Sequence, residues 1–539
     1  MAVVAEVATP EVVAPDGVAA TPIAAGFARN SMGSLLRTAS GAFLALLLPP
    51  LLIRRLGTEP YGVWAIGVEI GTYLALLDLG ALSAMGHFTA GLADEDDEGR
   101  GRVVSTMLAV QCALVAAGAV VLVALVACVP LIWSRMPDRL VGEARWTLGL
   151  IGASSLLSLL ATALSGYFLA IHRVVVPAAI TFGSRAIGAV AVAVLALRGG
   201  GIAELAVAWA VATVVGHVAI GVAFGRLRIP VRRTLVAGPL ARRMVAFCGA
   251  YGVWTLAAVL VTGLDTTIVA RLDFSAVAPY AAAAGAVAVL TAVYGSALAP
   301  LVPLSARLAA TGRTDELDDV FLRLVRWGAA AVVTTGAFAV LACPPILRAW
   351  LGGATAARSV PLLQVLVAAN ALRLLTFPYP VVLFGTGEHR RARWTPLIEG
   401  VVNVAASAVL GMAIGPIGVA VGTLLGSVAC VSVHLFVNLP ATRSLSVRAG
   451  TVVRRSLAGP VLVAVPAGAA FALRPFLAEA TWPALVASAV ALTALLAWTV
   501  ALAAEDRTAV RTFVAARLHR VHPDVSSLHP TPTAPGAQP

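Results

Sequence analysis

The sequence predicts an all-α protein that crosses a membrane about fourteen times. Apolar runs long enough to span a bilayer recur from about residue 30 to residue 504. A span needs about 20 mostly apolar residues, because a helix rises about 1.5 Å per residue through a hydrocarbon layer about 30 Å thick. The chain is 60% hydrophobic and only 12% charged, whereas about 25% is usual for soluble domains. The runs do not alternate apolar and polar residues, as the strands of an outer-membrane barrel would, so we expect helices.

The apolar runs give the positions of the predicted membrane spans along the chain. We place the spans at residues 31–53, 61–90, 103–133, 148–171, 176–198, 202–225, 244–270, 276–304, 327–347, 359–385, 394–414, 416–438, 456–473 and 483–503. Prolines are expected to bend three of them, at Pro49–Pro50 in the first, Pro300 and Pro303 in the eighth, and Pro378 and Pro380 in the tenth. Bent helices are candidate moving parts of a transporter.

Both ends of the chain differ in composition from the spans. Residues 1–29 are rich in Ala, Val and Pro and have no basic residue before Arg29, so we predict a disordered tail and no cleavable signal peptide. After Ala504, residues 505–522 are charged and are predicted to form a surface amphipathic helix, and a Pro-rich end follows. Residues 505–539 are therefore a predicted cytoplasmic tail.

The positive charges predict the orientation. The formal net charge is +12 and all 38 basic residues are arginine. Because these arginines gather in short loops between spans, we attribute them to membrane topology and expect no nucleic-acid partner. Loops after even-numbered spans, with the C-terminal tail, hold 24 arginines, and loops after odd-numbered spans hold 10. The arginine-rich side is normally cytoplasmic, so both termini are predicted to lie inside the cell.

An internal repeat divides the spans into two lobes. Tight connections at 198–201 and 415–416 indicate helical hairpins between spans five and six and between spans eleven and twelve. The matching positions Ile202 and Ile417 lie 215 residues apart, and the first and seventh spans start at about the same offset. We therefore predict an N-lobe of six helices at 30–243 and a C-lobe of six at 244–440, related by a pseudo-two-fold axis along the membrane normal. Two further helices follow at 441–504.

Seven charged residues within predicted spans are candidates for function, because a charge there is costly and often marks a pathway, a pair or a cavity. They are Arg37, Glu69, Asp78, Arg185, Asp265, Arg373 and Glu399. We expect the three arginines to bind an anionic phosphate group in a central cavity, because a guanidinium matches phosphate oxygens bidentately. The four acids are candidates for gating or coupling. The alternative is that acids and arginines pair between helices and only fix packing.

No catalytic constellation is found in the sequence. It has no P-loop and no paired acids suited to glycosyl transfer, so we do not expect an enzyme. The five cysteines lie singly within apolar spans and are expected in the core. We therefore predict no metal site and no cofactor.

Four motifs, in order along the chain, carry a family resemblance. The first is the turn RRLGTEPYG after the first span, with DLG near the end of the second. The next is LDTTIVARLDFSAVAPYAAA, with Asp265 and Tyr280, in spans seven and eight. ALAPLVPLSARLAATGRTDEL covers the end of the eighth span and the loop after it, and PLIEGVVNVAASAVLGMAIGPIGVAVGTLLG, with Asn403, forms the eleventh–twelfth hairpin. Residues 30–440 thereby resemble the polysaccharide-export flippases, an O-antigen flippase-like family. That family belongs to the multidrug/oligosaccharidyl-lipid/polysaccharide exporter superfamily.

The resemblance implies a function as well as a fold. Members of that family move lipid-linked oligosaccharides, usually on undecaprenyl diphosphate, across the cytoplasmic membrane by alternating access. Expected partners are then the lipid-linked oligosaccharide, membrane lipids, and the polysaccharide polymerase and glycosyltransferases of the same route. The motifs do not assign lipid II. Two alternatives stay open: a cation-coupled multidrug antiporter of the same superfamily, which would require an acid cluster in one lobe, and an integral-membrane glycan ligase or transferase, which would require large extracytoplasmic loops.

Overall fold

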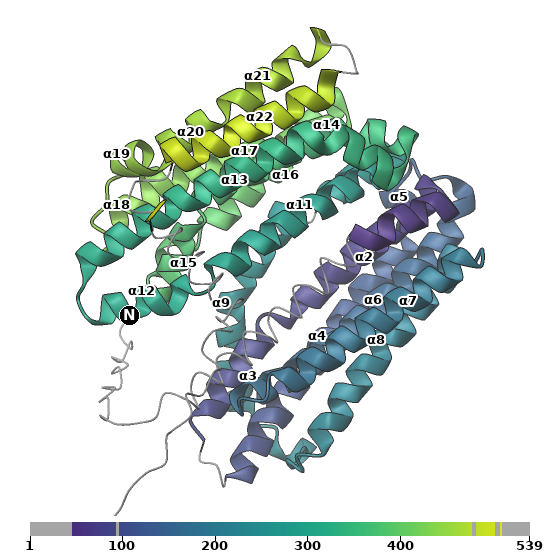
Figure 1. Ribbon diagram of the computed structural model, residues 1–539. Coiled ribbons are helices and arrows are strands. Elements are labelled where there is room, and N and C mark those ends of the chain that lie inside the picture. Colours follow the sequence, from purple (N-terminus) through teal and green to yellow (C-terminus); the bar gives the residue numbers. More distant parts are fainter. Residues whose placement is uncertain (1–45, 93–95, 263, 477–480, 502–506, 509–539) are drawn as a thin grey trace, which may run out of the picture. The chain divides into compact units, whose positions relative to one another are not determined.

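The structure is a computed structural model that describes residues 46–92, 96–262, 264–476, 481–501 and 507–508 (Figure 1). These residues form helices and no strand, which confirms the predicted all-α class. Twelve helices among them are long and apolar enough to cross a membrane. They match twelve of the predicted spans, and the other two predicted spans, 31–53 and 244–270, include residues outside the described ranges.

The chain divides into two compact units, Met1–Leu256 and Ala257–Pro539. The predicted lobes have their boundary thirteen residues earlier, at 243/244, and their symmetry stays a prediction. The first unit contains residues 46–56 in helical form and then α2 Thr58–Ala75, η1 Leu76–Asp78, α3 Ala81–Ala90, α4 Asp97–Ala127, α5 Val129–Ile132, α6 Asp138–Ala170, α7 Val175–Leu197, α8 Ile202–Gly225 and η2 Arg233–Leu235. Helix α9, Gly238–Thr262, runs across the division.

The second unit holds the remaining described elements. They are α10 Asp265–Leu272, η3 Phe274–Ala276, α11 Val277–Leu298, α12 Leu301–Ala310, α13 Thr314–Leu351, α14 Gly353–Leu374, α15 Pro378–Gly385, η4 His389–Ala392, α16 Thr395–Ile414, α17 Pro416–Val433, η5 His434–Asn438, α18 Leu439–Ala441, α19 Ala449–Val452, η6 Val453–Leu457, α20 Ala458–Val463, α21 Val465–Leu473, η7 Arg474–Phe476, α22 Trp482–Leu496 and η9 Ala497–Ala501. Both predicted hairpins are confirmed, since α7 packs on α8 and α16 packs on α17.

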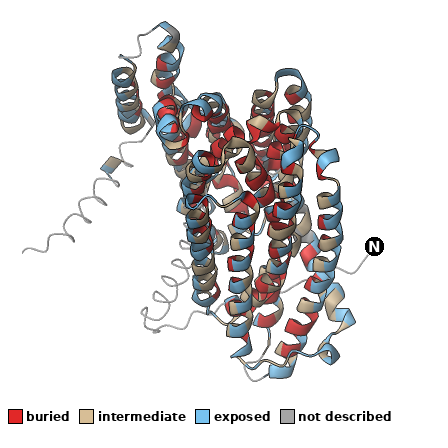
Figure 2. Ribbon diagram, turned by 90° about the vertical axis from the view of Figure 1, so that its right-hand side faces the viewer, coloured by how far each residue is buried: buried red, intermediate tan, exposed pale blue. Residues whose placement is uncertain are grey.

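Apolar side chains cover the outside of the helices as well as the inside. Figure 2 shows exposed positions along the long helices. Many of them are large and apolar, such as Val120, Ile187 and Met412, which are 72%, 67% and 73% exposed. A water-soluble protein rarely shows so much contiguous apolar surface, whereas helices in lipid require it. The chain is therefore an integral membrane protein. One cysteine, Cys112, is exposed on this surface, so its predicted place in the core is wrong.

Proline and glycine interrupt the spans at particular points. The eighth span breaks between α11 and α12 at Pro300, and the tenth breaks between α14 and α15 just before Pro378, as predicted. Residues 46–56 stay helical through Pro49–Pro50, so no break is found there. The second span was not expected to break, but it does so at the DLG motif, where Leu79 has φ 49° and Gly80 has φ 81°.

Helices α16 and α17 approach each other closely along one line of glycines. Gly418, Gly422 and Gly426 recur every fourth residue and so share one face of α17. A Cβ atom at Gly422 would lie 2.4 Å from the backbone nitrogen of Ser407, and one at Gly418 would lie 2.1 Å from the carbonyl oxygen of Leu410. No side chain fits there, so glycine lets the two backbones touch, as small residues do at membrane helix interfaces.

A carboxylate joins the two loops that flank this hairpin. Glu388 accepts hydrogen bonds from the backbone N–H groups of Arg443 and Ser444, at 3.1 and 2.6 Å, and pairs with Arg391 at 2.5 Å. Partial burial alone would raise the pKa of Glu388, but these hydrogen bonds outweigh it and lower that pKa below its usual value. The loop after α15 is thereby held against the loop after α18.

Candidate functional site

Among the described residues of the second unit, the most buried carboxylate is that of Asp265, which is 5% exposed. Its Oδ2 atom accepts hydrogen bonds from the hydroxyls of Thr423, at 2.8 Å, and Tyr280, at 3.1 Å. Its Oδ1 atom accepts one from the side-chain amide of Asn403 at 3.2 Å. These four residues are called the Asp265 cluster. All three donors are neutral, and Asp265 has no salt bridge within the described part of the chain.

Four helices meet to build the Asp265 cluster. Asp265 is the first residue of α10, Tyr280 lies in the first turn of α11, Asn403 is on α16 and Thr423 is on α17. The Asn403 amide also donates to the carbonyl oxygens of Val261 at 3.0 Å and Leu260 at 3.3 Å, near the end of α9 where the span is interrupted. Ser407 donates to the Asn403 side chain at 3.1 Å and to the carbonyl of Val419 at 3.0 Å. The amide of Asn403 is thus held in one orientation, with its nitrogen toward Asp265.

The Asp265 cluster is chemically suited to take up one positive charge. An ionised carboxylate in an apolar interior is costly unless it is paired or well supplied with donors. Neutral hydroxyl and amide donors stabilise it only in part. Binding a proton, or a small cation that the Asp265 and Thr423 oxygens can ligate, would remove the remaining cost. The described residues contain no group of three or more His, Cys, Asp or Glu side chains that could hold a metal ion.

A second charged group lies one helical turn away on α16. Glu399, with a side chain 7% exposed, pairs with Arg373 of α14 at 3.6 Å. Arg373 also donates to the side chain of Asn370 at 2.6 Å, and the Cys430 thiol of α17 contacts Glu399. A pairing of this kind between helices is what the structural alternative expects for Arg373 and Glu399. Their predicted roles in phosphate binding and coupling stay predictions.

The two groups share one face of α16. Glu399, Asn403 and Ser407 recur every fourth residue, and all three are buried. A Cβ atom at Gly426 of α17 would lie 3.0 Å from that of Asn403 and 3.1 Å from the carbonyl oxygen of Glu399. The polar face of α16 is therefore packed directly against the glycine line of α17.

The first unit holds the other candidates. Glu69 on α2 accepts a hydrogen bond from Tyr73, and Asp78 ends η1 with its carboxylate accepting from the N–H of Gly80 at 3.1 Å. Because the second span breaks beside Asp78, Glu69 and Asp78 do not lie on one regular helix. Arg185 lies on α7. Arg37 lies outside the described residues.

The sequence reasoning named Asp265, Tyr280 and Asn403 but missed Thr423, Ser407 and Asn370. The four-residue spacing of Glu399, Asn403 and Ser407 was a signal that could have found Ser407. No short-range pattern connects Thr423 to Asp265, which precedes it by 158 residues.

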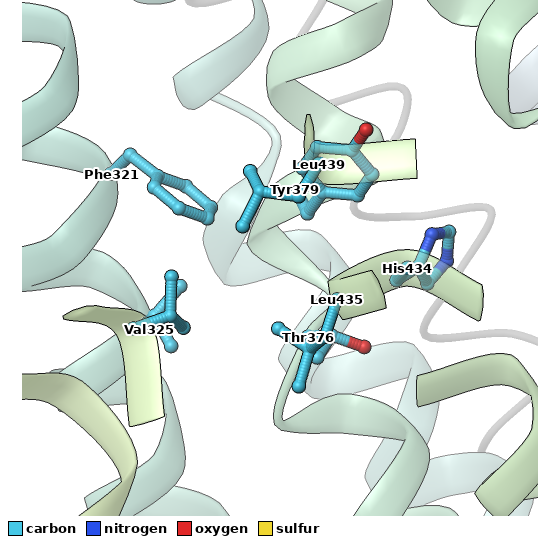
Figure 3. A pocket seen from close by; sticks show the side chains of 8 residues that line it. Phe321, Val325, Thr376, Tyr379, His434, Leu435 and Leu439 are labelled. Atoms are coloured by element: carbon cyan, nitrogen blue, oxygen red, sulfur yellow. The ribbon is translucent and has the colours of Figure 1, made fainter. Parts of the chain in front are cut away.

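A small cavity in the second unit lies apart from both charged groups. Figure 3 shows Phe321, Tyr379 and His434 among its lining residues. Its volume of about 10 Å³ is roughly that of one water molecule, so no sugar or lipid fits in it.

Comparison with known proteins identifies the fold. No protein-family model and no curated protein sequence matches the chain. Among solved structures, the chain is similar to the lipid II flippase MurJ in an inward closed conformation, with a TM-score of 0.68, 12% identity, and coverage of 91% of this chain and 98% of that one. It is also similar to an inward-facing multidrug resistance MATE family transporter of the MOP superfamily, with a TM-score of 0.57, 16% identity, and coverage of 75% and 96%. At these identities the likeness establishes the fold, which is the one shared by these transporters.

Proposed function

We propose that the protein is a flippase that moves a polyprenyl-diphosphate oligosaccharide across the cytoplasmic membrane for cell-envelope polysaccharide synthesis. The observation that carries the proposal is the extent of the fold match. The flippase covers 91% of this chain, whereas the multidrug transporter covers 75%. The four ordered motifs of the polysaccharide-export flippases support the same substrate class.

The intramembrane arginines are the proposed contacts for the diphosphate. A diphosphate cannot cross about 30 Å of hydrocarbon without fixed positive charge along its path. Arg37, Arg185 and Arg373 supply that charge, and the polyprenyl tail stays in lipid. Arg373 would exchange its bond to Glu399 for one to phosphate, so Glu399 sets how readily this arginine is released.

Asp265 is the proposed coupling group. Uptake of a proton or a small cation would change its charge, and its four-helix surroundings would transmit the change. Glu69 and Asp78 are proposed to act in gating in the first unit, where Asp78 lies at the break of the second span. None of these steps requires an enzyme activity or a cofactor.

Depleting the protein should trap a polyprenyl-diphosphate glycan in the cytoplasmic leaflet and abolish one surface polysaccharide. The expected cause is loss of the step that moves the head group outward. Lipid-linked intermediates can be extracted and identified by mass spectrometry, and surface glycan can be measured on the same cells. The identity of the accumulated saccharide also distinguishes lipid II from other lipid-linked glycans and points to the polymerase and glycosyltransferases that act as partners.

Unchanged intermediates and surface glycan, with increased sensitivity to cationic dyes, would contradict this proposal. The antiporter function would then replace it. Cells that express an unrelated membrane protein at the same level serve as the control for general envelope stress.

A cysteine placed between Arg226 and Arg243 should resist membrane-impermeant labelling in intact cells and react after the cells are opened. The arginine asymmetry predicts that this loop and both termini lie on the cytoplasmic side. The measurement uses a variant without the five native cysteines and, as a control, a cysteine at Gly199, on the opposite predicted side. Labelling of the 226–243 position in intact cells would reverse the proposed topology.

A further inference from the structure

The first unit has an apolar groove that the proposed transport mechanism does not use. It has a volume of about 620 Å³ and is lined by Leu122, Val123, Val126 and Ala127 of α4 and by Arg145 and Gly149 of α6. Small-molecule sites usually occupy about 300–1,000 Å³, so the groove is large enough for part of a lipid.

Local packing explains why space opens there. Helices α4 and α6 touch closely where a Cβ atom on Gly118 would lie 2.4 Å from Leu156 and one on Gly152 would lie 2.5 Å from Leu122. Less than one turn before Gly152, a Cβ atom on Gly149 would meet nothing within 4 Å. The groove thus begins where the tight contact ends, and no side chain fills it.

The groove has one cationic group, the exposed guanidinium of Arg145. One of its nitrogens donates to the carbonyl oxygen of Ala127, the last residue of α4, at 3.3 Å. That bond satisfies one open carbonyl at the helix end. A guanidinium carries five N–H donors, so others remain for an anion, and the described residues place no acid in a salt bridge with Arg145.

We infer that the Arg145 end of the groove lies at the depth of lipid head groups, because Arg145 falls between the predicted spans 103–133 and 148–171. Helix α4 has 31 residues, or about 46 Å, so its ends extend beyond a hydrocarbon layer of about 30 Å. The groove residues are within the last six of that helix. Trp146, next to Arg145, is 67% exposed, and tryptophan is enriched at the membrane–water interface. A guanidinium at this level, above an apolar channel, is complementary to the phosphate and upper acyl chain of a lipid.

We propose that this groove binds one anionic phospholipid, with its phosphate on Arg145 and one acyl chain along Leu122, Val126 and Gly149. The negative head group selects the lipid, because its charge complements Arg145 and the groove offers no acid to repel it. The bound lipid fills the space between α4 and α6 and should therefore stabilise the first unit.

The test uses the purified full-length protein, stripped of lipid in detergent and titrated with phosphatidylglycerol or phosphatidylcholine. Native mass spectrometry counts the lipids retained, and thermal unfolding reports stabilisation. Arg145→Ala removes the phosphate contact, and Gly149→Leu fills the groove. Matched controls are Arg198→Ala, which removes an exposed arginine from the same predicted side, and Gly183→Leu, a half-buried helical glycine whose Cβ would also meet nothing within 4 Å.

Wild-type protein and both controls should retain one more lipid molecule per protein in phosphatidylglycerol than in phosphatidylcholine. They should also unfold at a higher temperature when phosphatidylglycerol is bound. Arg145→Ala should weaken that site about tenfold, the effect of losing one hydrogen bond to a charged group. Arg145→Lys should recover part of the affinity. Equal retention of phosphatidylglycerol by wild type and Arg145→Ala would overturn the proposal. So would equal retention of phosphatidylcholine and phosphatidylglycerol by the wild type. Since Arg145 is exposed, this variant should fold even if Gly149→Leu does not.

Discussion

Replacing Asp265 by asparagine is expected to abolish transport while the protein still folds. Asparagine has nearly the same shape, and its oxygen can still accept from Thr423. It cannot change its charge by binding a proton or a cation. Its –NH2 group would also lie opposite the –NH2 group of Asn403, which now donates to Asp265, so two donors would meet without an acceptor between them. We expect a loss of about 1–3 kcal/mol of stability and of at least nine-tenths of transport.

Complementation of depleted cells, with thermal unfolding of purified protein, measures both effects. Thr423→Val removes a single hydrogen bond and should reduce transport without abolishing it. Asp273→Asn is the control for losing a carboxylate, since Asp273 lies nearby in sequence but is partly exposed and pairs with Arg358 at 2.9 Å. Wild-type transport by Asp265→Asn, with an unchanged response to ion gradients, would show that Asp265 does not couple transport.

Removing Arg373 alone should destabilise the protein far more than removing Arg373 and Glu399 together. Arg373→Leu leaves Glu399 buried without its partner, which typically costs about 3–5 kcal/mol. In the double variant Arg373→Leu/Glu399→Leu, no charge remains, and apolar replacements of buried ion pairs are often neutral. Unfolding of the wild type, Arg373→Leu, Glu399→Leu and the double variant in detergent forms a double-mutant cycle, which measures the coupling between the two side chains.

Transport by the double variant separates the two roles of Arg373. If Arg373 contacts the diphosphate, the double variant should be well folded but inactive, and Arg373→Lys should restore little because the bidentate fork is lost. Full transport by the double variant would leave Arg373 with the structural role only. The other two intramembrane arginines, Arg37 and Arg185, would then have to supply the phosphate contacts.

The sequence was sufficient for the fold class because a bilayer requires long apolar helices, and their lengths and hairpins can be counted. The break at Asp78–Gly80 was harder to predict from the sequence. A span that contains DLG is still apolar, and only the left-handed backbone of Leu79 and Gly80 shows that two helices meet there. Hydropathy records how apolar a segment is and says little about where its backbone turns.

The site could be predicted in part for a similar reason. A charge within an apolar run is conspicuous, so Asp265, Arg373 and Glu399 were found from the sequence. Hydroxyl groups in membrane helices are common and usually bond their own helix, as Ser165 does to Ala161 at 2.7 Å. Nothing local distinguishes Thr423 from such residues. Whether an arginine pairs with an acid, as Arg373 does, depends on which helices are neighbours, and that follows from tertiary packing.

The glycine line of α17 has a mechanical consequence. Two helices whose backbones touch, with no side chains between them to rearrange, are expected to move as one rigid body. Glu399 and Asn403 lie about 6 Å apart along the axis of α16, at about 1.5 Å per residue. If binding of a positive charge at Asp265 tilts α16, then α17 tilts with it. The same movement would shift Glu399 relative to Arg373. Loading of the ion site and release of an arginine would then be one motion, without a relay of intermediate side chains.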